Sequence, residues 1–68
     1  MKIRINGQIH ILPAPCSIFS ILEQFCGSPI PTGVAIALNE EVVAQGYWTT
    51  TMVEDGDIIE ILWASSGG

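Results

Sequence analysis

Isoleucines alternate with polar residues over the first eleven positions of the chain. The alternating residues are Ile3, Ile5, Ile9 and Ile11 in one set and Lys2, Arg4, Gln8 and His10 in the other. This period of two is typical of two half-buried β-strands, and Asn6-Gly7 between them is a strong hairpin signal. A two-residue loop would turn the isoleucines of one strand away from those of the other, whereas a three-residue loop keeps them together. We therefore predict a three-residue loop with Gly7 left-handed, and His10 exposed on the polar face.

Helical spacing replaces the alternation after Pro13-Ala14-Pro15. Because proline cannot donate to a strand ladder, this segment ends the second strand, and Ser17 is a natural N-cap. The apolar stripe that follows, at spacings of three and four, is Ile18, Ile21, Leu22 and Phe25. We predict a helix over residues 17–26 that packs this stripe on the core and ends at Gly27. Phe19 lies off the stripe, either under a loop, which we favour, or on a contact surface.

Three further apolar segments predict strands. They span residues 34–38, 42–43 and 58–63, and the last should place Ile59 and Ile61 on the core. Tyr47 and Trp48 lie in the connection before the last strand, where a large ring could cap one end of the core.

The order of elements is therefore hairpin, helix, strand, short strand, strand. Periodicity does not fix the order of strands in the sheet. If the last strand pairs parallel to the first and lies between it and the third, the result is the β-grasp or ubiquitin-like arrangement. We predict this α+β fold for residues 1–63, with a mixed sheet of four to five strands and one main helix on one face.

The charge of the chain limits its partners. Its 68 residues carry a net charge of −5, with Lys2 and Arg4 as the only basic side chains. Nucleic-acid binding needs cations against phosphates, so neither nucleic acid nor an anionic membrane surface is expected, and a basic protein partner fits better. The apolar runs are too short for a membrane span, and the start lacks the apolar region of a signal peptide. We predict a cytoplasmic protein.

Few side chains offer catalytic or metal chemistry. Cys16 and Cys26 are predicted to be reduced and buried, and with the single histidine they are too few for a zinc site. Glu54, Asp55 and Asp57 could suggest a metal site, but the sequence supplies no further ligands and we interpret them as a solvated turn. No acid–base pair, metal cluster or phosphate-binding loop stands out. We therefore predict that the chain binds no metal and is not an enzyme.

The last five residues, Ala64-Ser65-Ser66-Gly67-Gly68, are small and uncharged. Because glycine has no Cβ, the two glycines can lie extended in a channel too narrow for other residues. The Gly68 α-carboxylate is ionised at neutral pH and is a candidate nucleophile toward an activated phosphate. Five extended residues reach at most about 17 Å. We predict that residues 64–68 form a flexible diglycine tail, with Ser65, Ser66 and Gly67 entering partner active sites; a frayed or engineered terminus is the alternative.

Leu62 and Trp63 immediately precede this tail, on opposite faces of the last predicted strand. If one helix shields only one face of the sheet, one of these two side chains must be poorly covered. Exposed aromatic and large apolar residues often anchor interfaces. We therefore predict that the uncovered residue contacts a partner enzyme.

Several segments, taken in order, point to a known family. They are Ile3-Arg4-Ile5-Asn6-Gly7, Ser17-Ile18, Leu22-Glu23-Gln24, the run from Val34 to Val43, Trp48, the run from Glu54 to Leu62, and Gly67-Gly68. Over almost the whole chain they resemble the ThiS family, the small sulfur carriers of thiazole and thiamin biosynthesis. Ser65-Ser66 departs from the apolar or glycine residues that often precede the diglycine in relatives, so molybdopterin synthesis or another sulfur pathway stays open.

The resemblance implies a mechanism centred on Gly68, which is a substrate and not a catalyst. An E1-like adenylating enzyme would use ATP and magnesium to convert the terminal carboxylate to an acyl-adenylate. Sulfur from a cysteine desulfurase or another sulfur donor would displace AMP and leave a thiocarboxylate, whose sulfur is delivered to thiazole synthase. The carrier itself would hold no cofactor. A ubiquitin-like interaction module that binds through its sheet and never uses its end is an alternative of another class.

Overall fold

The computed structural model describes residues 1–63, and the predicted tail over residues 64–68 lies outside the described residues. The elements are β1 (Lys2–Ile5), β2 (Gln8–Ile11), β3 (Cys16–Ser17), α1 (Ile18–Cys26), β4 (Val34–Leu38), β5 (Glu41–Val42), a 3-10 turn (Gln45–Tyr47), β6 (Met52–Val53) and β7 (Ile58–Trp63). Five strands form one sheet in the order β2-β1-β7-β4-β5. β7 runs parallel to β1 and antiparallel to β4. The predicted β-grasp arrangement, with the last strand between the first and third, is confirmed.

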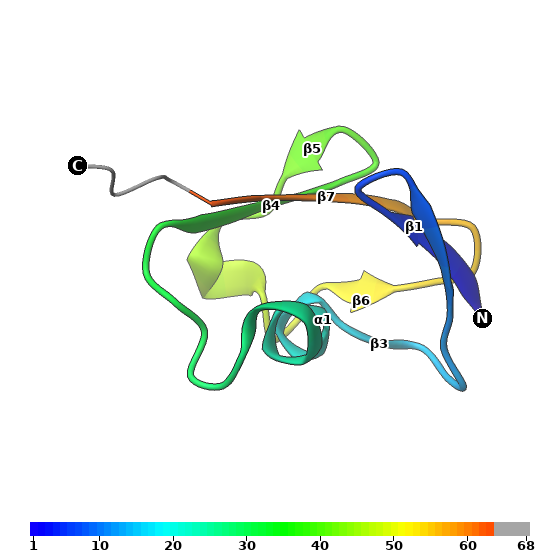
Figure 1. Ribbon diagram of the computed structural model, residues 1–68, viewed down its shortest axis with the longest axis horizontal. Coiled ribbons are helices and arrows are strands. Elements are labelled where there is room, and N and C mark those ends of the chain that lie inside the picture. Colours follow the sequence, from blue (N-terminus) through cyan, green and yellow to red (C-terminus); the bar gives the residue numbers. More distant parts are fainter. Residues whose placement is uncertain (64–68) are drawn as a thin grey trace.

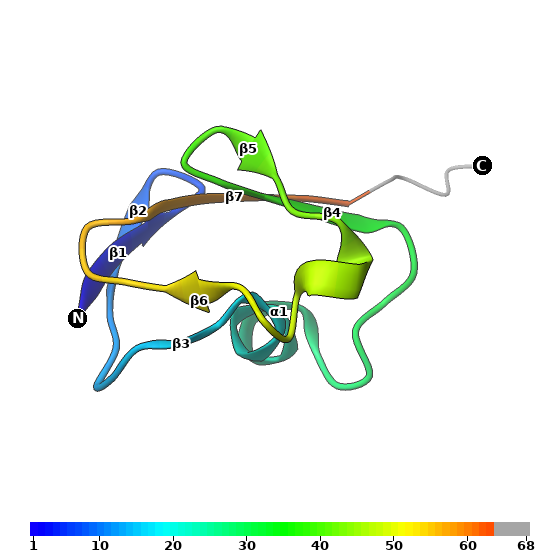
Figure 2. The same cartoon turned by 180° about the vertical axis from the view of Figure 1, so that it is seen from behind.

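The described chain forms two layers (Figure 1). The five-stranded sheet is one layer, and α1 with the small sheet of β3 and β6 forms the other. In the small sheet Cys16 pairs with Val53 and Ser17 with Met52. On the side of the five-stranded sheet away from α1, Figure 2 shows only strands of that sheet, such as β5. We call this side the outer face. Within residues 1–63 the fold thus leaves one face of the sheet uncovered.

Helix α1 begins and ends as its sequence predicts. The Ser17 hydroxyl accepts a hydrogen bond from the Ser20 N–H at 3.1 Å, which satisfies one free donor of the first turn. At the other end Gly27, at a φ of 108°, donates its N–H to the Glu23 carbonyl at 3.2 Å. A side chain at that φ would be strained, so glycine suits this stop. No helix within residues 1–63 is long and apolar enough to cross a membrane.

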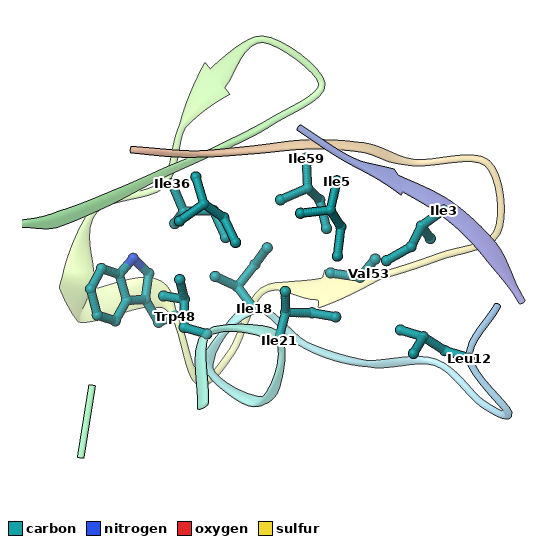
Figure 3. Close-up of a cluster of buried hydrophobic side chains, with 11 residues drawn as sticks. Ile3, Ile5, Leu12, Ile18, Ile21, Ile36, Trp48, Val53 and Ile59 are labelled. Carbon is teal, nitrogen blue, oxygen red and sulfur yellow. The ribbon is translucent and has the colours of Figure 1, made fainter. Parts of the chain in front are cut away.

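The core lies between the two layers (Figure 3). Its buried side chains are Ile3, Ile5, Leu12, Ile18, Ile21, Leu22, Ile36, Trp48, Val53, Ile59 and Ile61. Trp48 closes one end, as predicted, and its indole Nε1 donates to the Val43 carbonyl at 2.9 Å. This bond satisfies the one polar atom of the ring while its apolar surface is removed from water.

The hairpin between β1 and β2 differs from its prediction. Ile5 pairs directly with Gln8, so the loop has two residues and not three. Asn6 and Gly7 both have positive φ, 49° and 83°, as a type I′ turn requires. The twist of a type I′ turn matches that of the two strands, and this favours the two-residue loop. The prediction of a three-residue loop rested on the burial of the isoleucines alone. Gly7 is left-handed, as predicted.

The two-residue loop reverses the faces of β2. Ile9 and Ile11 lie on the outer face and are 54% and 71% exposed. His10 lies on the helix side instead, so the prediction that it is exposed on the polar face was wrong. Its ring is half-buried and packs edge-on against Phe25, with 4.8 Å between centroids. One residue of register therefore moved two isoleucines out of the core.

Two asparagines hold β7 where the flanking strands turn away. Beside β1, the Asn6 side chain accepts from the Ile61 N–H at 2.8 Å and donates to the Ile61 carbonyl at 3.2 Å. Beside β4, the Asn39 side chain accepts from the Ile58 N–H at 2.9 Å. Both asparagines are left-handed, at φ of 49° and 50°, a conformation that asparagine tolerates. Each side-chain amide therefore supplies hydrogen bonds to β7 at the point where the main chain of the neighbouring strand no longer pairs with it.

We expect Asn6→Ala to lower the free energy of unfolding by about 2–5 kcal/mol. Two hydrogen bonds to β7 are lost, at about 0.5–1.5 kcal/mol each, and alanine at positive φ adds about 1–2 kcal/mol of strain. Asn6→Gly is the matched control, because it removes the same bonds without the strain and should cost less. Urea unfolding followed by tryptophan fluorescence measures both. Wild-type stability in Asn6→Gly would show that the side chain does not hold β7.

Candidate functional site

The carboxyl end of β7 is the described part of the chain next to the predicted tail. Its pairing with β4 continues to the last residue, with Leu62 opposite Ala35 and Trp63 opposite Val34. On the other side, β1 pairs only as far as Ile59, and the Asn6 side chain extends the contact to Ile61. The last two residues of β7 are therefore held from one side only, and β7 runs past α1 at this end (Figure 1).

Leu62 and Trp63 are both poorly covered. Leu62 is 67% exposed on the outer face, and Trp63 is 52% exposed although it shares the side of Ile59 and Ile61. The prediction that one of them is poorly covered is confirmed by Leu62, and Trp63 is exposed as well because the helix layer does not extend along the whole strand. The two side chains give the end of β7 an apolar residue on each face, directly before the tail.

The outer face carries further apolar side chains that sequence reasoning missed. They are Ile9, Ile11, Val42 and Ile58, and they share this face with Leu62. Charged residues lie among them: Lys2 and Arg4 on β1 and Glu60 on β7 are exposed on the same face. The exposure of Ile9 and Ile11 could have been predicted only from the length of the hairpin loop, because isoleucine is usually buried in the core. Apolar side chains among charges are typical of the surfaces that proteins use for contact.

The acidic turn before β7 bonds to its own chain. The Asp57 carboxylate accepts from the Glu54 N–H at 2.7 Å and from the Asn39 side-chain amide at 3.0 Å. The Asp55 carboxylate accepts from the Lys2 N–H at 2.7 Å. Within residues 1–63 no group of three or more histidine, cysteine, aspartate or glutamate side chains could hold a metal ion. These two aspartates organise the entry to β7.

Both cysteines are free thiols and half-buried. Cys16 lies in β3 and Cys26 ends α1. Burial raises the pKa of both thiols above their ordinary value. Since the thiolate is the nucleophile, a raised pKa makes each a weak nucleophile at neutral pH. The thiols have the environment of packing residues, although they are less deeply buried than predicted.

The predicted reacting residue, Gly68, and the predicted channel residues Gly67, Ser66 and Ser65 lie outside the described residues. The described part of the candidate site is thus the end of β7 and the outer face. This part can dock against another protein, and it offers no set of side chains for acid–base or nucleophilic catalysis among residues 1–63.

Comparison with known proteins gives concordant matches. The model of the ThiS family matches residues 3–68. The chain is 31% identical to the sulfur carrier protein ThiS of Escherichia coli (strain K12) over 68 residues, which is 100% of both chains. That relative is named as a carrier and not as an enzyme.

Two solved structures share the fold. A crystal structure of the thiamine biosynthesis protein (ThiS) of Geobacter metallireducens superposes with a TM-score of 0.81 at 25% identity, and each chain is covered completely. A solution structure of a thiamine biosynthesis protein from the same organism gives a TM-score of 0.79 at 25% identity, covering 100% of this chain and 88% of the other. The similarity in sequence and in fold extends over the full length of the chain.

We expect iodoacetamide to alkylate Cys16 and Cys26 more slowly in the folded chain than in urea at about pH 8.5, because burial leaves less thiolate. The folded pKa lies above the unfolded one. The protonated thiols therefore favour the folded state. Their contribution to the free energy of unfolding is complete below the ordinary cysteine pKa of about 9, and it is lost as the pH rises through the folded pKa. Single Cys16→Ser and Cys26→Ser variants assign the two rates. Equal rates in folded and unfolded chain would contradict the protection of the thiols.

Proposed function

The chain belongs to the ThiS family and is a sulfur carrier, not an enzyme, and on that premise we propose that it carries sulfur as a thiocarboxylate on Gly68 for thiazole formation in thiamin biosynthesis. One observation carries the proposal: the family match extends through Gly68, and the chain and its carrier relative cover each other completely. The names of both solved relatives refer to thiamine biosynthesis, which favours this pathway over molybdopterin synthesis.

Activation is the first step of the proposal. An ionised carboxylate is a poor acyl donor, because its carbonyl carbon is weakly electrophilic and it has no good leaving group, so an E1-like adenylating enzyme supplies ATP with magnesium. A Gly68 carboxylate oxygen attacks the α-phosphorus, the bond between the α- and β-phosphates breaks, and pyrophosphate leaves. The product is an acyl-adenylate in which AMP is a good leaving group. Magnesium and ATP belong to the activating enzyme, and no cofactor is assigned to the carrier.

Sulfur transfer follows. The terminal sulfur of a persulfide, formed by a cysteine desulfurase or another sulfur donor, attacks the Gly68 carbonyl carbon and AMP leaves. The resulting acyl disulfide is cleaved by a second thiol, which forms a disulfide with the donor sulfur and releases the thiocarboxylate. That sulfur attacks an electrophilic carbon of the substrate held by thiazole synthase. A water molecule then attacks the Gly68 carbonyl carbon, the bond between that carbon and the sulfur breaks, the sulfur stays with the substrate, and the Gly68 carboxylate is restored.

The carrier contributes positioning. In the proposal residues 64–68 are a flexible tail that reaches at most about 17 Å from the body, so the β-grasp domain stays outside the partner's active site. Gly67 has no Cβ and so fits a narrow channel beside Gly68. Ser65 and Ser66 are small enough to follow. The proposed reactions take place in the cytoplasm, with free protein partners and not with nucleic acid or membrane.

Leu62 and Trp63 are proposed as contacts to the partner enzymes. Their exposure and their place directly before the tail support this role. Only a few residues of the chain separate Leu62 and Trp63 from Gly68. The surface of an enzyme that holds Gly68 in its active site therefore lies close to both of these side chains. The net charge of −5 favours partners with a basic surface, because opposite charges speed association.

We expect pyrophosphate exchange to depend on Gly68. Deleting it moves the carboxylate back by about 3.5 Å, which removes the in-line approach to the α-phosphate. The full-length chain with its activating enzyme, ATP and labelled pyrophosphate should give exchange, and the deleted chain should give none. Addition of the sulfur source should then change the intact mass by the replacement of one oxygen with sulfur.

A Ser66→Ala chain is the matched control, because it alters the tail without moving its end, and it should retain exchange. Circular dichroism of the deleted chain should match the wild type. Equal exchange from full-length and deleted chains would contradict the role of Gly68 and favour an interaction module.

We expect Leu62→Ala and Trp63→Ala to weaken binding to the activating enzyme or to thiazole synthase by about 1–2 kcal/mol, roughly a 5- to 30-fold rise in dissociation constant. Tyr47→Ala is the control, because Tyr47 is 65% exposed outside the five-stranded sheet. Calorimetric titration and thermal unfolding measure affinity and stability together. Unchanged affinity of both β7 variants for both enzymes would remove these residues from the interface.

A further inference from the structure

Strand β2 presents an open hydrogen-bonding edge. Met1 and Leu12 exchange both main-chain hydrogen bonds, at 2.6 and 2.8 Å. Hydrogen-bonded and non-bonded pairs alternate along an antiparallel ladder, so the pairs that contain Ile9 and Ile11 are the non-bonded ones. The N–H and C=O groups of these two isoleucines therefore point away from β1. Since β2 ends the sheet order, no strand of residues 1–63 pairs with them.

This edge lacks the features that usually prevent pairing between sheets. Exposed edges are commonly shortened, charged, bulged or interrupted by proline. β2 is four residues long and contains neither Lys, Arg, Asp, Glu nor proline, and its register with β1 is regular. The opposite edge, β5, has two residues, one of which is Glu41, and it follows Glu40. One edge of the sheet is thus protected and the other is not.

Apolar side chains accompany the free main-chain groups. Ile9 and Ile11 are 54% and 71% exposed on the outer face beside this edge. A strand added to β2 would satisfy the main-chain groups, and its own apolar residues would cover the two isoleucines. Cross-strand pairs of β-branched residues stabilise such a contact.

We propose that β2 binds β2 of a second copy of this chain, antiparallel, with Ile9 opposite Ile11 of the second copy and a two-fold axis at His10. This register uses the free N–H and C=O groups of both isoleucines in both chains. It also gathers all four isoleucines on one outer face. The contact is self-complementary, as a two-fold dimer requires. The proposal does not rest on the function of the tail.

Two features favour this register and this partner. Moving the two-fold axis by one residue, from His10 to Ile11, would shift the pairing by two residues and place Pro13 opposite Ile9, and proline has no N–H to donate. A second β2 brings no carboxylate or ammonium group into the seam. The nearest cations, Lys2 and Arg4, lie on β1, so those of the two copies are separated by three strand spacings. This is about 14 Å and exceeds the Debye length of about 8 Å at physiological salt, so repulsion between them is weak.

The dimer leaves the end of β7 accessible. β7 lies two strands from β2, and a two-fold axis perpendicular to the sheet places both helices on the same side. The contact between the two β2 strands involves about four residues of each chain. Stable interfaces bury about 1,200–2,000 Å² and use about 20–30 residues of each partner, so this contact is much smaller. We therefore expect a weak dimer, with a dissociation constant in the micromolar to millimolar range.

Sedimentation equilibrium of the full chain, from micromolar to millimolar concentration, tests the association. The average mass should rise from 7.3 kDa toward twice that value. Ile11→Lys should raise the dissociation constant at least about tenfold, because it adds two ammonium groups to the seam. Val42→Lys is the matched control: Val42 is 79% exposed on the outer face of the other edge strand, and its substitution should leave the dimer intact. A monomer at every concentration, or equal loss in both variants, would overturn the proposal.

A disulfide tests the register in a chain with Cys16→Ala and Cys26→Ala. His10→Cys places two thiols directly opposite each other, where a non-bonded antiparallel pair has its Cα atoms about 4.5 Å apart, within the range for a disulfide. Gln8→Cys is the control, because its two copies would be separated by about 14 Å along the strands. Mild oxidation should cross-link His10→Cys and not Gln8→Cys. Cross-linking of Gln8→Cys alone would overturn the register, and equal, slow cross-linking of both would indicate random collision and overturn the dimer.

Discussion

The whole fold depends on the insertion of β7 between β1 and β4. Without this strand the hairpin and the β4–β5 pair would share no hydrogen bond in the sheet, and Ile59 and Ile61 would leave the core open. Each half of the chain could offer only a few strand residues over one short helix, which is less than a stable core needs. The strand that leads to the tail is thus also the strand that joins the sheet.

The two asparagines make this insertion compatible with short flanking strands. β1 and β4 both turn away from β7, and at each turn an asparagine in the left-handed conformation supplies the next hydrogen bonds from its side chain. Asparagine suits both tasks, since it tolerates positive φ and its amide carries the same donor and acceptor as a peptide group. The same residues therefore end one strand and extend the hold on its neighbour.

Much of this arrangement could be predicted from the sequence because its signals are local. Ser17 and Gly27 mark the ends of α1, and alternation identifies the buried side of β7. The hairpin register could not be predicted in this way, because Asn6-Gly7 suits more than one loop length and the isoleucines appeared to require burial. β3 and β6 escaped notice because two residues are too few for a period. Leu62 and Trp63 were identified as candidates from sequence, but their joint exposure depends on where the helix layer ends, which is a property of the packed fold.

The position of β7 also determines when the chain can fold during its synthesis on the ribosome. Asn6 and Ile61, which bond to each other, are separated by 55 residues, so the closing contacts are among the most distant that the chain can make. A nascent chain that stops before β7 has no central strand and cannot complete its sheet. Folding of this domain must then await the synthesis of β7, and loop closure of this length slows it further. A chain whose synthesis stops before β7 would lack both the folded domain and the residues that follow β7. The folded domain and these residues therefore become available at the same stage of synthesis.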